Sequence, residues 1–292
     1  MELSIEEFTP QQARQILSKQ PKNRKLKAAK CAEIAAQITG GEWTLNGETI
    51  KFNKSGSLRD GQNRLMAVIL ANNPIRTAVA REIDDKAFES VDTGTKRTEG
   101  DRLELKGYKN ANKLASMVKI IWQLENRLCV GGSGPLTHKA GEAIIRKYDL
   151  QGQIDPSFDQ FPYGSKINGL FAVFNHIDSE ASDAFKAAVI LGENLSVDHP
   201  AMALRRQILF AASSNMARVK MILTAIVAYV IKGWNAYYTG ASVKRLVYRG
   251  GEPCPHIEGS NFPDVPREDL YLNAAGRAKK AFERGQIVNW NA

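Results

Sequence analysis

The stretch Asp60-Gly61-Gln62-Asn63-Arg64 has the residue types and spacing of an anion-binding turn, and it stands between an expected strand and an expected helix. Asp60 can cap the helix by accepting a hydrogen bond from an N–H two or three residues on. Gly61 allows a close backbone approach or an unusual φ. The helix start presents free N–H groups at the positive end of its dipole, and Arg64 adds a guanidinium fork. This chemistry suits a phosphate. The alternative is a capped helix start in which Arg64 forms a structural ion pair.

A second polar stretch, residues 91–98, carries the strongest carboxylate candidate for catalysis. Asp92 is placed to act as a metal ligand or general base if a phosphoryl reaction takes place, and Asp60 is the other candidate catalytic carboxylate. The alternative is a structural turn into a helix capped by Thr98, with Asp101 at the capping-box position. Residues of this stretch that can face the same ligand are Thr93, Thr95, Lys96 and Arg97.

A third candidate surface interleaves aromatic and basic side chains between residues 232 and 249. Rings among cations can stack on bases while the charges meet phosphates. The alternative is ordinary packing, because Trp234 and Tyr238 are four residues apart and share one helix face. The candidate nucleic-acid-binding residues are Arg205, Arg206, Trp234, Lys244, Arg245 and Arg249.

The elements that must position these residues form a mixed pattern in the first third of the chain. Thr9 begins a helix with Pro10 in its first turn and Gln12 at the capping-box position. Residues 1–107 are therefore expected to form one mixed α/β domain. We expect helices at 10–19, 26–39 and from 61 onward, helical turns at 84–90, and strands at 43–45, 48–52, 57–59 and 75–80.

From residue 109 onward the pattern is almost entirely helical. Residues 108–292 are expected to form a mainly helical domain that binds DNA or a partner, so the fold class of the whole chain is α+β. The expected helices lie at 111–128, 137–148, 165–176, 179–191, 201–212, 216–238 and 267–284, with a candidate short strand at 243–248.

The composition is that of a soluble globular protein, with 43% hydrophobic and 24% charged residues. It excludes a disordered tail protein, a collagen and a disulfide scaffold. The 40 basic against 31 acidic residues give a net charge of +9, which favours a polyanionic partner such as nucleic acid. The cysteines and histidines show no metal-ligand spacing, so we expect no metal site and a reducing cytoplasm. No apolar run is long enough to span a bilayer, so we expect no membrane partner.

The order of helix, strand, turn, strand, D-G-Q-N-R helix and strand resembles the N-terminal domain of the ParB/sulfiredoxin superfamily over about residues 20–100. The corresponding turn reads G-E-R-R in ParB proteins, G-C-H-R in sulfiredoxins and D-G-Q-H-R in a broad group of uncharacterised proteins. It contacts nucleotide phosphates in the family, so the resemblance implies that role for Gly61, Gln62, Asn63 and Arg64. It also implies a phosphate contact for Arg24, ahead of the second helix.

The sequence departs from the D-G-Q-H-R form at Asn63, where a histidine is usual. Asn can donate to a phosphate or bind an adenine edge, but it cannot act as a general acid or base. The whole chain also resembles a set of uncharacterised proteins from phages and mobile elements, through the later segment from Lys232-Gly-Trp-Asn to Gly240. That resemblance supplies a setting and no activity.

Together these observations predict a nucleotide- or phosphate-binding, DNA-associated protein, with ATP or CTP as the nucleotide and Mg²⁺ bridging its phosphates. Arg24 and Arg97 would neutralise charge, and nucleotide binding would change how the domains pack. Three alternatives stay open: a phosphotransferase or DNA-base-modification enzyme, a non-catalytic inhibitor of a host defence protein, and a nuclease, which is less favoured because no metal-binding carboxylate cluster stands out. Asn63 in place of histidine favours the second. The sequence leaves open whether the chain forms a homodimer.

Overall fold

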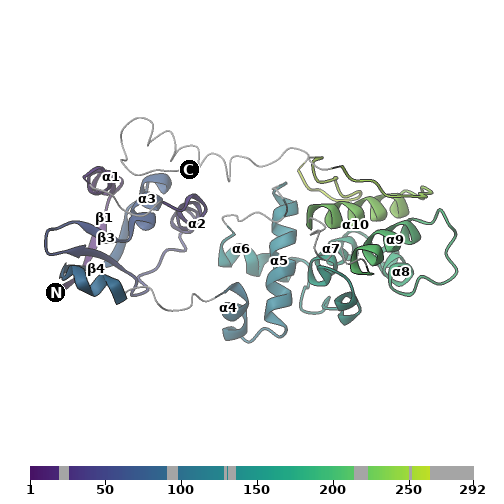
Figure 1. Cartoon of the computed structure of the whole chain (residues 1–292), viewed down its shortest axis with the longest axis horizontal. Coiled ribbons are helices and arrows are strands. Elements are labelled where there is room, and N and C mark those ends of the chain that lie inside the picture. The colour runs from purple at the N-terminus through teal and green to yellow at the C-terminus, as the bar shows by residue number, and fades with distance from the viewer. Residues whose placement is uncertain are drawn as a thin grey trace. The chain divides into compact units, whose positions relative to one another are not determined.

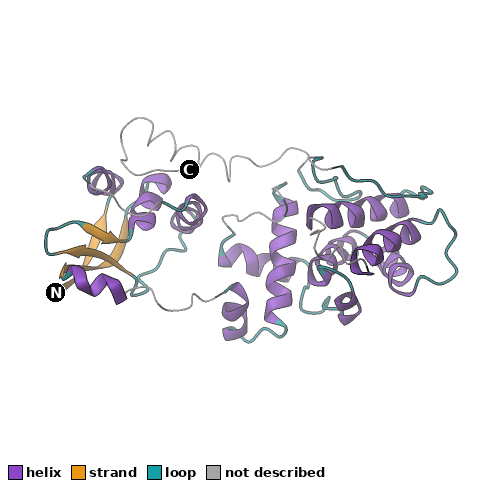
Figure 2. Cartoon of the chain, viewed as in Figure 1, coloured by secondary structure: helices purple, strands orange, loops and turns teal. Residues whose placement is uncertain are grey.

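A computed structural model of the chain describes residues 1–19, 26–90, 98–127, 130, 136–213, 223–249 and 252–263. These residues contain a four-stranded mixed sheet and ten α-helices, so the fold class is α+β, as the sequence predicts (Figure 1, Figure 2). They fall mainly into two compact units, one within residues 1–96 and one within residues 97–267.

The sheet of the first unit has the order β1-β4-β2-β3, so β4 and β2 are its inner strands. β4 pairs antiparallel with β1 and parallel with β2, and β2 pairs antiparallel with β3 across a tight turn. A register shift interrupts β2 between Lys51 and Phe52. The strands are β1 (Glu2–Phe8), β2 (Thr49–Asn53), β3 (Leu58–Asp60) and β4 (Ile75–Ile83), followed by a 3₁₀ helix, η1 (Asp85–Ser90).

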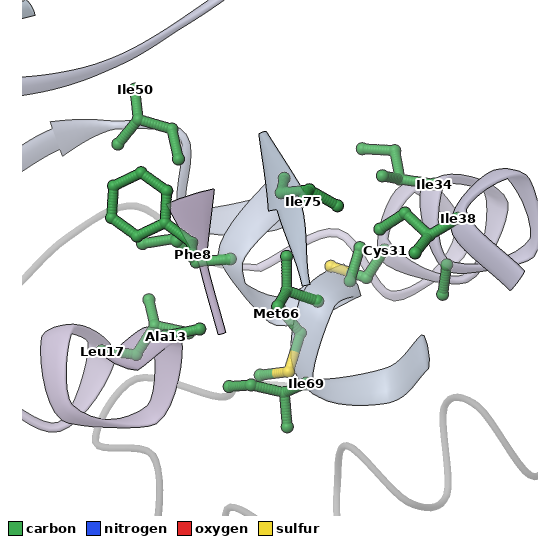
Figure 3. Packing of buried hydrophobic residues seen from close by; sticks show 14 of the residues in the cluster. Phe8, Ala13, Leu17, Cys31, Ile34, Ile38, Ile50, Met66, Ile69 and Ile75 are labelled. Carbon is green, nitrogen blue, oxygen red and sulfur yellow. The ribbon is translucent and has the colours of Figure 1, made fainter. Parts of the chain in front are cut away.

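Three helices cover one face of this sheet: α1 (Pro10–Ser18), α2 (Ala28–Thr39) and α3 (Gln62–Ala71) (Figure 1). The expected capping box is present at α1, where the Gln12 N–H donates to Thr9 Oγ1 and the Thr9 N–H donates to Gln12 Oε1. The helices bury an apolar core against the sheet, in which Met66, Ile50 and Ile75 are almost fully covered (Figure 3).

Two features of the sheet differ from the prediction. β1 was not expected, because its sequence is acidic and only Phe8 is buried, while Leu3 and Ile5 remain 69% and 55% exposed. Pairing with β4 stabilises it instead, and Arg81 of β4 forms an ion pair with its Glu6 at 2.8 Å. Residues 43–45 are not a strand. Trp43 contacts the neighbouring strand through its side chain instead of its backbone, because its Nε1–H donates to the Arg76 carbonyl at 3.0 Å.

The second unit is helical. Its central helix is α7, which packs against α5, α8 and α10 and buries every residue from Ile167 to Phe174. Gly169 lets α7 approach α5 closely, because a Cβ there would lie 3.1 Å from Met117 Cα. The elements are α4 (Glu99–Leu105), α5 (Ala111–Glu125), α6 (His138–Lys147), the 3₁₀ helix η2 (Pro156–Gln160), α7 (Gly164–Ile177), α8 (Ser179–Leu191), α9 (Pro200–Ser213) and α10 (Leu223–Tyr238).

The division between the units falls near residue 97, earlier than the expected boundary at 107, because α4 packs against α5. The expected capping box between Thr98 and Asp101 does begin α4. Residues 243–248 are irregular and do not form a strand. Two of their carbonyls accept hydrogen bonds from helix side chains instead of from a strand, Leu246 from Gln207 and Val247 from Lys232. The helix expected at 267–284 lies outside the described residues.

Two glycines of the helical unit make a matched test of this packing. A Cβ at Gly164 would lie 2.1 Å from the Phe158 carbonyl oxygen, whereas one at Gly141 would meet only Val118 Cγ1 at 3.5 Å. We expect Gly164→Ala to lower the free energy of unfolding by at least about 2 kcal/mol through overpacking. Gly141→Ala should raise it by about 0.5–1 kcal/mol, since alanine favours a helix interior. Chemical denaturation measures both, and equal effects would contradict the packing described.

Candidate functional site

The turn at residues 60–64 is built around Gly61, which has φ +102° and is the N-cap of α3. Its position is tight as well as left-handed, because a Cβ would lie 2.9 Å from Ile50 Cγ1 and 3.2 Å from Ile50 Cα. Only glycine suits both requirements. The α3 backbone therefore starts directly against the inner strand β2.

Asp60 does not cap α3 in the way the sequence predicts, because it still belongs to strand β3 and the N-cap position falls on Gly61. Its Oδ1 accepts the Gly61 N–H at 2.7 Å, and its Oδ2 lies 3.4 Å from Nζ of Lys51, its cross-strand partner. The carboxylate is thus engaged by a cation and by the backbone, which makes it a structural group here.

Arg64 projects back from the first turn of α3 to strand β2 and the residue before it. Its Nη1 donates to the Thr49 carbonyl and its Nη2 donates to Glu48 Oε2, both at 2.7 Å, and its side chain is only 13% exposed. This is the structural ion pair that the sequence left as the alternative. Arg64 therefore fixes α3 on the sheet, and a phosphate at this turn would have to share its guanidinium.

Asn63 links two helices that the sequence did not connect. Its Oδ1 accepts the Lys27 N–H at 3.0 Å and the Cys31 S–H at 3.4 Å, and no described residue accepts a hydrogen bond from its Nδ2. Gln62, beside it, is 5% exposed and lies in the core. Since Lys27 is the N-cap of α2, the Asn63 side chain holds the beginning of α2 next to the beginning of α3.

The two helix starts that meet at Asn63 are electrostatically alike. Neither N-cap residue, Lys27 for α2 or Gly61 for α3, makes a side-chain capping bond, and neither first turn contains an acidic residue. α2 adds the cations Lys27 and Lys30, the second paired with Glu33 at 2.7 Å. Two positive dipole ends and a lysine-bearing first turn favour an anion at this place.

Six predicted site residues lie outside the described residues: Arg24, Asp92, Thr93, Thr95, Lys96 and Arg97. Their roles stay predictions. Within the described part of the chain, no group of three histidine, cysteine or acidic side chains is arranged to hold a metal ion. The same residues include no helix of the length and apolarity that crossing a membrane requires.

A hollow of about 570 Å³ opens at the other ends of α2 and α3, where both helices finish. Its lining is mainly apolar and includes Ile38, Trp43 and Pro74, with Arg76 as the cation. It is therefore separate from the paired helix starts at Asn63, and its lining offers little that would recognise a phosphate.

The aromatic member of the predicted nucleic-acid surface is a core residue. Trp234 is 0% exposed, its ring stacks on Phe174 at 4.5 Å and on Tyr238 at 5.0 Å, and its Nε1–H donates to the Glu258 carbonyl. The packing alternative, that Trp234 and Tyr238 share one face, describes this arrangement. A buried ring with covered faces has no surface on which a base can stack.

The basic members of that surface separate into two groups. Arg205 Nη1 donates to the carbonyls of Val189 and Ile190, the second at 2.8 Å, so it binds the C-terminal end of α8. The other four are exposed: Arg206, Lys244, Arg245 and Arg249. They remain candidates for contact with a polyanion.

The K-x-W-N segment noted in the sequence fastens the coil after α10 onto the helix. Lys232 Nζ donates to the Val247 carbonyl at 2.6 Å and pairs with Glu252 at 3.2 Å. Asn235 Nδ2 donates to the His256 carbonyl at 2.7 Å, and its Oδ1 accepts the Glu258 N–H at 3.0 Å. In this structure the segment positions Val247, Glu252, His256 and Glu258.

No family model, no curated protein and no solved structure matched the chain when it was compared with each. The likeness to the ParB/sulfiredoxin superfamily therefore stays a prediction from the sequence.

The environment of Cys31 makes stability depend on pH. The side chain is 0% exposed, and burial raises the pKa of its thiol to about 12. An unfolded thiol ionises near pH 8.5, so the contribution of Cys31 is complete below that pH and is lost as the pH rises toward about 12. Between pH 8.5 and 10 we expect the free energy of unfolding to fall by roughly 2 kcal/mol more in the wild type than in Cys31→Ala. A wild-type pH dependence in Cys31→Ala would disprove the assignment.

Asn235 offers a test of the fastened coil. Asn235→Ala removes both hydrogen bonds to residues 256–258, so we expect a loss of about 1–3 kcal/mol in the free energy of unfolding and faster proteolysis of residues 243–263. Asn175→Ala is the matched control, because it removes one side-chain bond, from Gln153 Nε2 at 3.0 Å. Proteolysis of this coil at the wild-type rate in Asn235→Ala would show that the bonds do not hold it.

Proposed function

We propose that the chain binds a nucleotide phosphate at the paired starts of α2 and α3, and that it does so as a DNA-associated protein. The observation that supports this most directly is the contact between Asn63 Oδ1 and the Lys27 N–H, which keeps the two helix N-termini together. Neither N-terminus has an acid in its first turn. A nucleoside triphosphate, ATP or CTP with Mg²⁺ on its phosphates, supplies the charge that such a place attracts.

The orientation of Asn63 adds a hydrogen-bond donor to the site. Its oxygen is occupied by Lys27 and Cys31, so the amide Nδ2–H₂ is the part of the side chain left to donate to a phosphate oxygen. Lys27 brings the nearest cation of α2. Arg64 acts through its bonds to Thr49 and Glu48, as a residue that positions α3.

The same contacts favour binding over turnover. A general base must be placed beside the reacting group and be able to take its proton. Asp60 is engaged by Lys51 and the Gly61 N–H, and Asn63 cannot take up a proton. For the DNA association, the support is the net charge of +9, a property that raises affinity for any polyanion.

Asn63→Asp tests the site without removing its structural bond. A carboxylate can still accept the Lys27 N–H, but it places a negative charge where the phosphate is proposed to bind. Calorimetric titration of the full chain with ATP or CTP and Mg²⁺ should show binding in the wild type. In Asn63→Asp we expect affinity to fall at least about 30-fold, that is about 2 kcal/mol.

Asn72→Asp is the matched control. It adds the same charge at the other end of α3, on a residue with φ +52°, a conformation that aspartate tolerates. Nucleotide affinity should be unchanged there. Equal losses in the two variants, or no binding of either nucleotide by the wild type, would reject the proposed site.

A further inference from the structure

Two lysines of the helical unit lie near each other, and neither pairs with a carboxylate of the described residues: Lys119 on α5 and Lys166 in the first turn of α7. Lys119 is exposed and Lys166 is half-buried. The pKa of Lys166 is lowered, first by burial and then by the positive charge of Lys119. No ion pair joins either lysine to an acid in the part of the chain that the structure describes.

The carboxylates on and beside η2 and on α8, the elements that pack against α7, are already paired with other lysines. Lys113 Nζ, on the same helix as Lys119, lies 2.5 Å from Asp159 Oδ2. Lys186 Nζ lies 3.2 Å from Asp183 and 3.8 Å from Asp155. Among the described residues, two positive charges therefore lie without a paired acid where α5 and α7 meet.

The backbones of α5 and α7 fix the stems of these lysines. Gly169, one turn after Lys166, packs so closely that a Cβ would lie 3.0 Å from Ile120 Cγ2 and 3.1 Å from Met117 Cα. Lys119 lies between these two residues of α5 in the sequence. The aliphatic parts of Lys119 and Lys166 therefore extend from two helices that are tightly packed against each other.

Tyr163 precedes α7 in an unusual backbone conformation. It has φ +59° and ψ +31°, in the left-handed region, where a bulky side chain is uncommon and glycine or asparagine is preferred. Gly164 packs against the Phe158 carbonyl and leaves no slack in the turn. The residue nevertheless remains 40% exposed, and Lys166 Nζ lies 5.5 Å from the centroid of its ring. Backbone strain that holds a large side chain at the surface is a reason to seek a function for it.

We propose that Tyr163, Lys166 and Lys119 form a contact for a single-stranded nucleic acid. An exposed aromatic ring can stack on an unpaired base, while the two ammonium groups meet successive phosphates. A phosphate between the lysines would also relieve their repulsion. A ring beside uncompensated cations fits a nucleic-acid strand better than an acidic protein, which has no base to stack. This surface shares no residue with the nucleotide site and does not depend on it.

The test uses the full chain and a fluorescently labelled 20-nucleotide oligothymidylate, with anisotropy measured over a range of KCl concentrations. Lys119→Gln/Lys166→Gln should weaken binding at least about tenfold at low salt and reduce the salt slope by about 1.4, two contacts at about 0.7 each. Tyr163→Asn should weaken binding by about fivefold or more through lost stacking, with an unchanged or raised melting temperature, because asparagine accepts the left-handed conformation.

Lys113→Gln/Lys186→Gln is the control, because it changes the net charge by the same amount but removes lysines that are paired with acids. Its salt slope should equal that of the wild type. Equal slope losses in the two double variants, stronger binding to the matching duplex than to the single strand, or no binding of the strand by the wild type would each overturn the proposal. Oligouridylate in parallel tells whether the strand is DNA or RNA. Nucleotide affinity should be unaltered in Lys119→Gln/Lys166→Gln, which separates this surface from the nucleotide site.

Discussion

The first unit depends on one side-chain amide, that of Asn63, whose oxygen holds the backbone of Lys27. This bond holds the start of α2 beside the start of α3. The α3 helix is in turn fixed on the sheet by Gly61 and Arg64. The buried face shared by α2 and α3 then continues from Cys31 to Ile38 (Figure 3). The place proposed to bind an anion is thus the same place where two core helices of the unit are aligned.

Local signals in the sequence were sufficient for much of the fold. The capping boxes at Thr9 and Thr98, the hairpin of β2 and β3, and most helices of the second unit are confirmed, because each is decided by residues within one turn or one helix. β1 was missed, because its stability comes from a strand some seventy positions away in sequence. The Asn63 contact was missed for the same reason, since its partner lies 36 residues away.

The candidate site residues illustrate a different limit. Basic and aromatic residues between 205 and 249 have the composition of a nucleic-acid surface, yet Arg205 binds the carbonyls at the end of α8 and Lys232 binds that of Val247. Trp234 fills the core. A cation that satisfies an orphan carbonyl and a cation that meets a phosphate look alike in sequence. Lys119 and Lys166 belong to no sequence motif. Only the structure distinguishes them from other lysines, by the lack of an ion pair with an acid among the described residues.

The strand order of the sheet has a consequence for how the first unit is made. β4 is the last of the four strands along the chain, yet it pairs with both β1 and β2. During synthesis the four-stranded sheet cannot be completed until β4, which ends at Ile83, has left the ribosome. Until then β1 has no strand partner. Leu3 and Ile5 are exposed even in the finished sheet, so they stay uncovered throughout that interval. The acidic residues of the same strand, Glu2, Glu6 and Glu7, are charges of the kind that keep an unpaired strand from pairing with another nascent chain.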